Sequence, residues 1–165
     1  PRLPFTVHHL PLSLIFARMS TVAVKIINQS VHPLPAYATS GSSGMDLRAN
    51  IQSAIELKSL ERTLVPTGLF IELPEGYEAQ IRPRSGLAVK QGITCLNTPG
   101  TTDADHRRAI PVTLFTLTLE VRGRQPGARS AQMVGQKVEI VQWEAVDTLN
   151  STVRDAGGFG HTGKS

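Results

Sequence analysis

The sequence predicts an all-β protein, built as an antiparallel sandwich or barrel. Short runs rich in valine, isoleucine, threonine and phenylalanine follow one another at residues 22–27, 62–73, 77–83, 111–121 and 137–146. Turn sequences separate these runs: GSSG, LPEG, NTPG and RQPG. No long helical pattern stands between the runs, and only Val89 and Lys90 onward suggest a helical turn. Strands that lack crossover helices are expected to pair antiparallel.

Composition narrows the class of protein further. The chain has 165 residues, of which 40% are hydrophobic and 18% charged, which is typical of one folded domain. The single cysteine, Cys95, excludes a disulfide framework and a cysteine-cluster metal site, and favours a reducing compartment, the cytoplasm. No apolar run is long enough to span a membrane.

The net charge of +4 is consistent with ordinary solubility and with some attraction for anions such as a polyphosphate or nucleic acid. Aromatic residues make up only 5% of the chain, which does not favour a base-stacking surface for single-stranded nucleic acid. A nucleic-acid or membrane partner is therefore not expected.

The two ends of the chain differ from its middle. Residues 1–18 are apolar, rich in proline and free of acidic residues, which indicates a disordered leader or a region upstream of a start at Met19. A signal peptide is the alternative interpretation, although the apolar stretch 10–17 is short. Residues 19–150 form the expected β domain, and the glycine-rich residues 151–165 are expected to be a mobile lid.

Polar, glycine-containing segments interrupt the strand pattern and carry the candidate site. Asp46 follows a Gly-Ser turn, where it caps the turn or lies near a metal-bound polyphosphate. Arg84, Ser85 and Gly86 form either a surface turn or an anion cradle that opens a helix. Taken singly, a turn-capping aspartate and a surface turn are the commoner interpretations. Only the presence of both segments in one chain indicates phosphate binding.

Residues 96–106 are expected to form a hairpin with Pro99 and Gly100 in its turn. Asp103 and Asp105 alternate along one predicted strand and so share a face. That face is either simply solvated or presents a carboxylate as a general base. In the tail, an isolated phenylalanine between glycines, Phe159, favours a lid over a merely disordered end.

Taken together, these segments closely resemble the trimeric deoxyuridine triphosphatases, the dUTPases, of bacterial type. The resemblance covers residues 24–164, nearly the whole chain beyond the leader. Five motifs of that family stand here in order as SSGMDLRA, PRSGLA, LNTPGTTDAD, ARSAQMV and RDAGGFGHTG. The combination of PRSGLA with GGFGHTG in a chain of this length is specific.

The resemblance implies a distorted β jelly roll and a homotrimer whose active sites lie between subunits. The implied reaction is hydrolysis of dUTP to dUMP and pyrophosphate, with Mg²⁺ bound to the three phosphates. Such an enzyme keeps uracil out of DNA and supplies dUMP for thymidylate synthesis. Because Mg²⁺ prefers phosphate oxygens and water, the substrate is expected to bring most of its ligands.

The resemblance also implies roles for individual residues. Asp103 matches the carboxylate that activates the attacking water, and Asn97 matches the residue that reads uracil. The remaining matches bind the substrate or orient metal-bound water: Arg84, Ser85, Gly86 and Gln132 for phosphates, Asp46 for the water on the metal, Arg154 for the γ-phosphate, Phe159 for stacking on uracil, and His161 and Thr162 along the polyphosphate.

The chain departs from the family pattern in and after the third motif. His106 stands where the family has the tyrosine that packs under deoxyribose, and Arg108 replaces a glycine. Pro111 falls within an expected strand, and the resemblance fades over residues 108–130. Ser130 occupies a position expected to be buried and apolar, which costs free energy if its hydroxyl lacks a partner.

Arg122 and Arg124 add charge to this stretch, where an apolar strand is expected. Two explanations remain open: genuine divergence, or compensating frame errors in the reading. The same departures leave other functions as alternatives to an active dUTPase: a non-catalytic nucleotide-binding relative, an enzyme like dCTP deaminase that shares the fold, or a basic β-barrel that binds nucleic acid.

Overall fold

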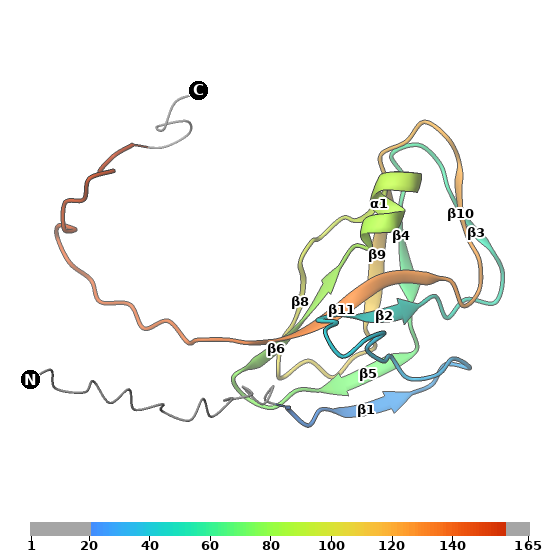
Figure 1. Ribbon diagram of the computed structural model, residues 1–165, viewed down its shortest axis with the longest axis horizontal. Helices are drawn as coiled ribbons and strands as arrows, with labels where there is room; N and C mark the ends of the chain where they lie inside the picture. Colours follow the sequence, from blue (N-terminus) through green and yellow to red (C-terminus); the bar gives the residue numbers. More distant parts are fainter. Residues whose placement is uncertain (1–20, 158–165) are drawn as a thin grey trace, which may run out of the picture.

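Short strands and one short helix make up residues 21–157, the part of the chain that a computed structural model describes (Figure 1). In chain order these elements are β1 Lys25–Asn28, β2 Met45–Arg48, β3 Ile55–Leu57, β4 Arg62–Pro66, β5 Leu69–Glu72, β6 Tyr77–Arg82, α1 Ser85–Gln91, β7 Ile93–Cys95, β8 Gly100–Thr102, β9 Pro111–Thr116, β10 Arg122–Arg124 and β11 Arg129–Lys137. The predicted leader, residues 1–18, lies outside the described residues.

All of the paired strands run antiparallel, which confirms the predicted all-β class. One sheet has the order β2-β11-β6-β8 and a second has the order β4-β9-β7, with β1-β5 and β10-β3 as separate pairs. Within residues 21–157 none of these sheets closes on itself. Of the two predicted arrangements, sandwich and barrel, the structure therefore has open sheets that pack against one another. None of the helices in this part of the chain is long and apolar enough to cross a membrane.

A hydrophobic core forms between the sheets because alternate residues of each strand point inward. In β9, Val112, Leu114 and Thr116 are buried, whereas the residues between them are more exposed. Leu47 of β2 and Val65 of β4 are fully buried against the same core.

The helix begins within residues 84–86, as expected if that segment opens a helix, and before the helical turn that Val89 and Lys90 suggested. Val89 and Lys90 do lie in α1, but the helix starts at Ser85, directly after Arg84. It ends at Gly92, whose φ of 60° is left-handed and whose N–H is donated to Ala88. A Cβ at this glycine would come within 2.9 Å of Thr118 Cγ2, so both conformation and space require glycine here.

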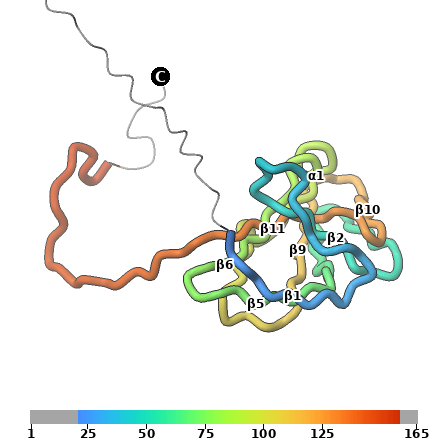
Figure 2. The backbone as a smooth tube through the Cα atoms, turned by 60° about the horizontal axis from the view of Figure 1, so that its bottom comes forward, coloured from blue at the N-terminus to red at the C-terminus, as the bar shows by residue number. Residues whose placement is uncertain are grey.

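The predicted strand at 137–146 is wrong. The last strand, β11, covers Arg129–Lys137, and residues 138–150 that follow have no regular structure. Ile140 and Trp143 are 87% and 90% exposed, so an alternating pattern alone did not make a strand. A strand forms only when its backbone pairs with the edge of a neighbouring strand, and among the described residues no strand pairs with residues 138–146. Figures 1 and 2 both show it running away from the sheets.

The predicted hairpin at 96–106 is also wrong. β7 pairs with β9 and β8 pairs with β6, so the two strands belong to different sheets, and residues 96–99 pass from one sheet to the other. Asp103 follows the end of β8, and its carbonyl accepts a hydrogen bond from the N–H of His106 at 3.1 Å. Asp103 and Asp105 therefore lie in a turn and not on one face of a strand.

The unusual residues of the 108–130 stretch have places in this fold. Pro111 is the first residue of β9, a position where a missing N–H is tolerated. Ser130 is buried, but its hydroxyl donates to the Ala128 carbonyl at 3.1 Å, so the expected penalty is avoided. Arg124 is buried in β10 and donates to the Gln91 side chain at the end of α1.

Candidate functional site

Asp46 of β2 holds two arginines in place. Its Oδ1 accepts a hydrogen bond from Arg84 Nε at 2.8 Å, and its Oδ2 accepts one from Arg129 Nη1 at 3.2 Å. Arg84 directly precedes α1, and Arg129 is the first residue of β11, so one carboxylate ties three segments together. The predicted turn cap is thus an ion-pair centre, in which negative charge fixes the direction of two guanidinium groups.

Gln132 lies beside this centre. In the register of the sheet it stands opposite Asp46 on one side and Arg82 on the other. Residues paired across antiparallel strands point to the same face, so these three side chains share one face. They line an open hollow of about 360 Å³ together with Ala36, Ala38, Ser42, Ser43, Gly44, Pro83 and Val134.

The first turn of α1 presents small residues to solvent. Ser85 and Gly86 are exposed, whereas Leu87 is buried and anchors the helix on the core. A Cβ at Gly86 would meet nothing within 4 Å, so the glycine leaves open space above the backbone. Arg84, Ser85 and Gly86 therefore form an accessible rim next to the Asp46 centre.

A further positive side chain, Arg124, approaches this region from β10. Burial lowers the pKa of the Arg124 guanidinium from its ordinary value, and the charge of Arg84 lowers it further. Its Nε has no hydrogen-bond partner among the described residues. A buried arginine near Arg84 makes this side of the fold electropositive.

Asn97, Asp103 and His106 lie on the segments around β8. Asn97 is exposed and packs closely on Gly100, where a Cβ would come within 3.0 Å of its Nδ2. Asp103 is exposed and lines a hollow of about 440 Å³ that Glu75 and Glu78 also line. The carboxylate is therefore accessible to water and to a ligand.

The described chain does not bring Asp103 into the Asp46 centre. In the pairing of β6 with β8, Thr102 stands opposite Ala79, so Asp103 is level with Glu78. Arg82 lies four residues further along β6, which corresponds to about 13 Å along the strand. Within one subunit the candidate base and the candidate phosphate site are thus separate.

Of the predicted lid, only its first part is described. Arg154 is exposed, and its Nε donates to the carbonyl of Gly157 at 2.8 Å, so it forms a local turn. Phe159, His161 and Thr162 lie outside the described residues.

The side chains of the described residues do not form a metal site by themselves. Among residues 21–157 no group of three histidine, cysteine, aspartate or glutamate side chains could hold a metal ion. Both oxygens of Asp46 already accept hydrogen bonds from arginine, which disfavours a direct bond to Mg²⁺. Contact through water, as the sequence analysis expected, is compatible with the remaining lone pairs.

Sequence reasoning did not single out Arg82, Arg107 and Arg129. Arg129 stands inside the ARSAQMV motif, but the family resemblance supplied a role only for Gln132 of that motif. Arg107 follows His106 directly, in the third motif. Only the folded geometry shows that Arg129 contacts Asp46 and that Arg107 contacts the turn after β8.

A family model described as dUTPase matches residues 31–163 of this chain. The chain belongs to the dUTPase family. Among curated dUTPases, a deoxyuridine 5'-triphosphate nucleotidohydrolase of Fusobacterium nucleatum is 53% identical over 146 residues, which are 88% of this chain and all of that protein. The enzyme of the same name from Cytophaga hutchinsonii is 57% identical over 87% of this chain and 94% of its own length.

Solved dUTPases share the fold. The dUTPase of Staphylococcus bacteriophage 80alpha, solved with dUpNHpp, has a TM-score of 0.76 and 19% identity, over 87% of this chain and all of that chain. A mutant dUTPase from phage phi11 of S. aureus, whose structure concerns a structural Mg(II) ion, has a TM-score of 0.68 and 16% identity, over 79% of this chain and all of that chain. These likenesses confirm the jelly-roll-like fold expected from the motifs.

Proposed function

We propose that this chain hydrolyses dUTP to dUMP and pyrophosphate. The observation that carries the proposal is its identity of 53–57% to curated deoxyuridine triphosphate nucleotidohydrolases along nearly their whole length. The dCTP deaminase-like, nucleic-acid-binding and non-catalytic alternatives have no comparable support. Such an enzyme keeps uracil out of DNA and supplies dUMP.

The phosphates of dUTP bind on the rim formed by Arg84, Ser85 and Gly86, with Gln132 beside them. The ion pair of Asp46 with Arg84 supports this role, because it orients the guanidinium before substrate arrives. Positive groups fixed at this position stabilise the negative charge that phosphoryl transfer develops.

Asp103 acts as the general base. Its carboxylate takes a proton from the water that attacks the α-phosphorus, a role that needs an accessible carboxylate within one water of phosphorus. The exposure of Asp103 is compatible with that role. Asn97 and the neighbouring backbone bind uracil, and His106 contacts the sugar.

The substrate is the magnesium complex of dUTP. When bound, Mg²⁺ draws negative charge from the phosphate oxygens and fixes their geometry. Asp46 contacts the ion only through water, which agrees with the arginines already bound to both of its oxygens.

The active form is a homotrimer whose sites lie between subunits. Two observations support this assembly. Asp103 and the Asp46 centre lie apart within one chain, so a second subunit must complete the site. The extended segment after β11 also carries exposed apolar side chains, including Ile140, Trp143 and Leu149, which an adjacent subunit would bury.

The lid, residues 151–165, closes over a site formed by other subunits. Arg154 binds the γ-phosphate, Phe159 stacks on uracil, and His161 and Thr162 line the polyphosphate. The exposed start of this segment, which has no contact with the sheets, leaves it free to reach another subunit (Figure 2). The cytoplasm is the proposed location, because the substrate is a nucleoside triphosphate and Cys95 is a free thiol.

The test is a substrate panel of dUTP, dTTP, dCTP and UTP with Mg²⁺ and detection of pyrophosphate. We expect release from dUTP at a much higher kcat/KM than from the other three. Sedimentation or light scattering on the same sample measures the assembly. Binding of dUTP without pyrophosphate release would instead favour the non-catalytic relative, and ammonia release from dCTP would favour a deaminase.

A further inference from the structure

Arg107 contacts the turn that carries the candidate base. Its Nη1 donates two hydrogen bonds to main-chain carbonyls, to Ala104 at 2.6 Å and to His106 at 2.9 Å. The same turn is closed by the N–H of His106, which donates to the Asp103 carbonyl at 3.1 Å. One guanidinium nitrogen thus bridges the middle and the end of the turn.

This turn needs such support, because it is short and lies at the surface. Asp103 and Asp105 are exposed, Ala104 packs against the core, and His106 is half-buried. A solvated turn held by one backbone hydrogen bond opens easily. Charge-assisted hydrogen bonds from a guanidinium are stronger than neutral ones and hold both carbonyls in one geometry.

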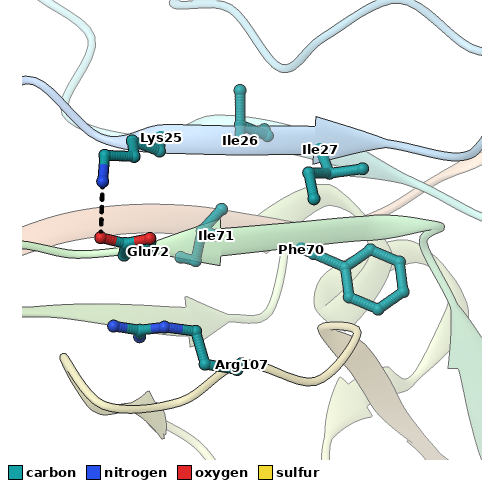
Figure 3. Close-up of a pocket in the computed structure, with 7 residues that line it drawn as sticks. All are labelled: Lys25, Ile26, Ile27, Phe70, Ile71, Glu72 and Arg107. Carbon is teal, nitrogen blue, oxygen red and sulfur yellow. Dashed lines mark hydrogen bonds and ion pairs between the residues drawn. The ribbon is translucent and has the colours of Figure 1, made fainter.

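A second contact region fixes Arg107 itself. Its side chain lies along β5 and lines a hollow of about 230 Å³ together with Lys25, Ile26, Ile27, Phe70, Ile71 and Glu72 (Figure 3). Glu72 is paired with Lys25 at 2.8 Å across β1 and β5. The Lys25 hydrogen bond and charge hold the pKa of Glu72 below its ordinary value, and the charge of Arg107 acts in the same direction. The guanidinium thus lies near enough to Glu72 for its charge to act on that carboxylate while Nη1 contacts the turn.

We propose that Arg107 is a positioning residue for hydrolysis: it fixes the turn Asp103–Ala104–Asp105–His106 and thereby sets where the general base and the sugar-contacting residue stand. The inference rests on the proposed function. Arg107 contacts neither substrate nor reacting atoms in this role and acts through Asp103 and His106. Because a displacement of about 1 Å in a reacting group can cost about 100-fold in rate, loss of this support is expected to lower kcat.

The central experiment compares Arg107→Met with Arg108→Met. Both variants lose one positive charge at neighbouring exposed positions, but Arg108 makes no hydrogen bond among the described residues. We expect Arg107→Met to lower kcat by about 10- to 100-fold, with much less change in the dissociation constant for dUpNHpp. Arg108→Met keeps the parental kcat. Arg107→Lys regains part of the rate, because an ammonium still donates to carbonyls.

A double variant tests the route of the effect. If Arg107 acts through Asp103, adding Arg107→Met to Asp103→Asn lowers the residual rate little further, because the base is already absent. A loss in the double variant equal to the product of the two single losses overturns the proposal and assigns Arg107 a general structural role.

One readout does not depend on activity. Amide hydrogen exchange at His106 is expected to be faster in Arg107→Met than in the parent or in Arg108→Met. Parental exchange together with parental kcat in Arg107→Met overturns the proposal. If the parent releases no pyrophosphate from dUTP but exchange at His106 is still faster in Arg107→Met than in the parent, the proposed function is overturned and the role of Arg107 in the turn remains supported.

Discussion

Arg84 Nε donates a hydrogen bond to Asp46 Oδ1 at 2.8 Å, across a sequence separation of 38 residues. The two side chains are about one quarter and one fifth exposed, so this ion pair lies at the edge of the fold, between an exposed pair and a buried one. It joins the first and second family motifs in one chain, and its carboxylate partner Asp46 lines the hollow beside Gln132.

The first prediction concerns this pair. Asp46→Asn removes the negative charge that orients Arg84 and Arg129, and we expect a loss of about 1–2 kcal/mol in the free energy of unfolding, between the values for exposed and buried pairs. The KM for dUTP should rise more than kcat falls, because a phosphate-binding group becomes less ordered. Urea unfolding and steady-state kinetics measure the two effects. Arg48→Met, which removes a nearby exposed arginine whose side chain donates a hydrogen bond to the Gly127 carbonyl, is the control.

The second prediction concerns Asp103. Asp103→Asn keeps the size of the side chain but removes the proposed general base, so hydrolysis of dUTP should fall by about 10²–10⁴-fold. Binding of dUpNHpp, measured by calorimetry, should persist. A variant that keeps most of the parental rate would show that another group activates the water.

The third prediction concerns the tail. Truncation after Asn150 should leave the domain folded, because the last strand ends at Lys137 and the described residues from 139 to 156 are exposed. Catalysis should nearly vanish if residues 151–165 are the proposed lid, since a lid excludes water and binds the phosphates. Circular dichroism and pyrophosphate release distinguish the outcomes. Full activity would remove the lid role, and an unfolded product would make the tail structural.

The fourth prediction concerns His106, where the family has tyrosine. Imidazole is smaller than a phenol ring and has a donor and an acceptor, so it tolerates a 2′-hydroxyl better. We expect the parent to accept UTP better, relative to dUTP, than His106→Tyr does. The measurement is kcat/KM for both nucleotides in both proteins, because specificity is that ratio. Equal ratios would assign sugar selectivity to the backbone around Asn97.

The fifth prediction concerns Cys95. Burial raises the pKa of this thiol from 9.0 to about 11. Below about pH 8 the thiol is almost fully protonated in both states and adds no pH dependence. Between about pH 9 and 11 only the unfolded thiol ionises, so the free energy of unfolding should fall by about 2–3 kcal/mol in total and then level off.

Urea unfolding of the parent and of Cys95→Ala across pH 8–11 isolates this effect, because other groups titrate equally in both proteins. Parallel curves would contradict the shift. A thiol reagent at pH 8 should also react far more slowly with the folded chain than with the unfolded one.

The sequence by itself determined the class of fold and the family. Runs of β-branched residues between turn sequences predicted antiparallel strands, and the five motifs identified the dUTPase family because they are local features, legible residue by residue. The same motifs supplied Asp46 and Gln132, which the structure brings around one hollow, and Arg84, which donates a hydrogen bond to Asp46.

Only the tertiary structure decided how these segments pair. The sequence predicted that residues 96–106 form one hairpin, but β7 and β8 belong to different sheets. It also predicted a strand at 137–146, but residues 138–146 do not pair with a strand of the described chain. The tertiary structure also showed that Arg129 contacts Asp46 and that Arg107 supports the turn of Asp103. The physical reason is the same in each case. A strand is completed by hydrogen bonds to a partner strand that is far away in the sequence, and an arginine side chain binds whichever acceptor the fold places near it. The local sequence pattern therefore predicts neither the partner of a strand nor the acceptor of an arginine.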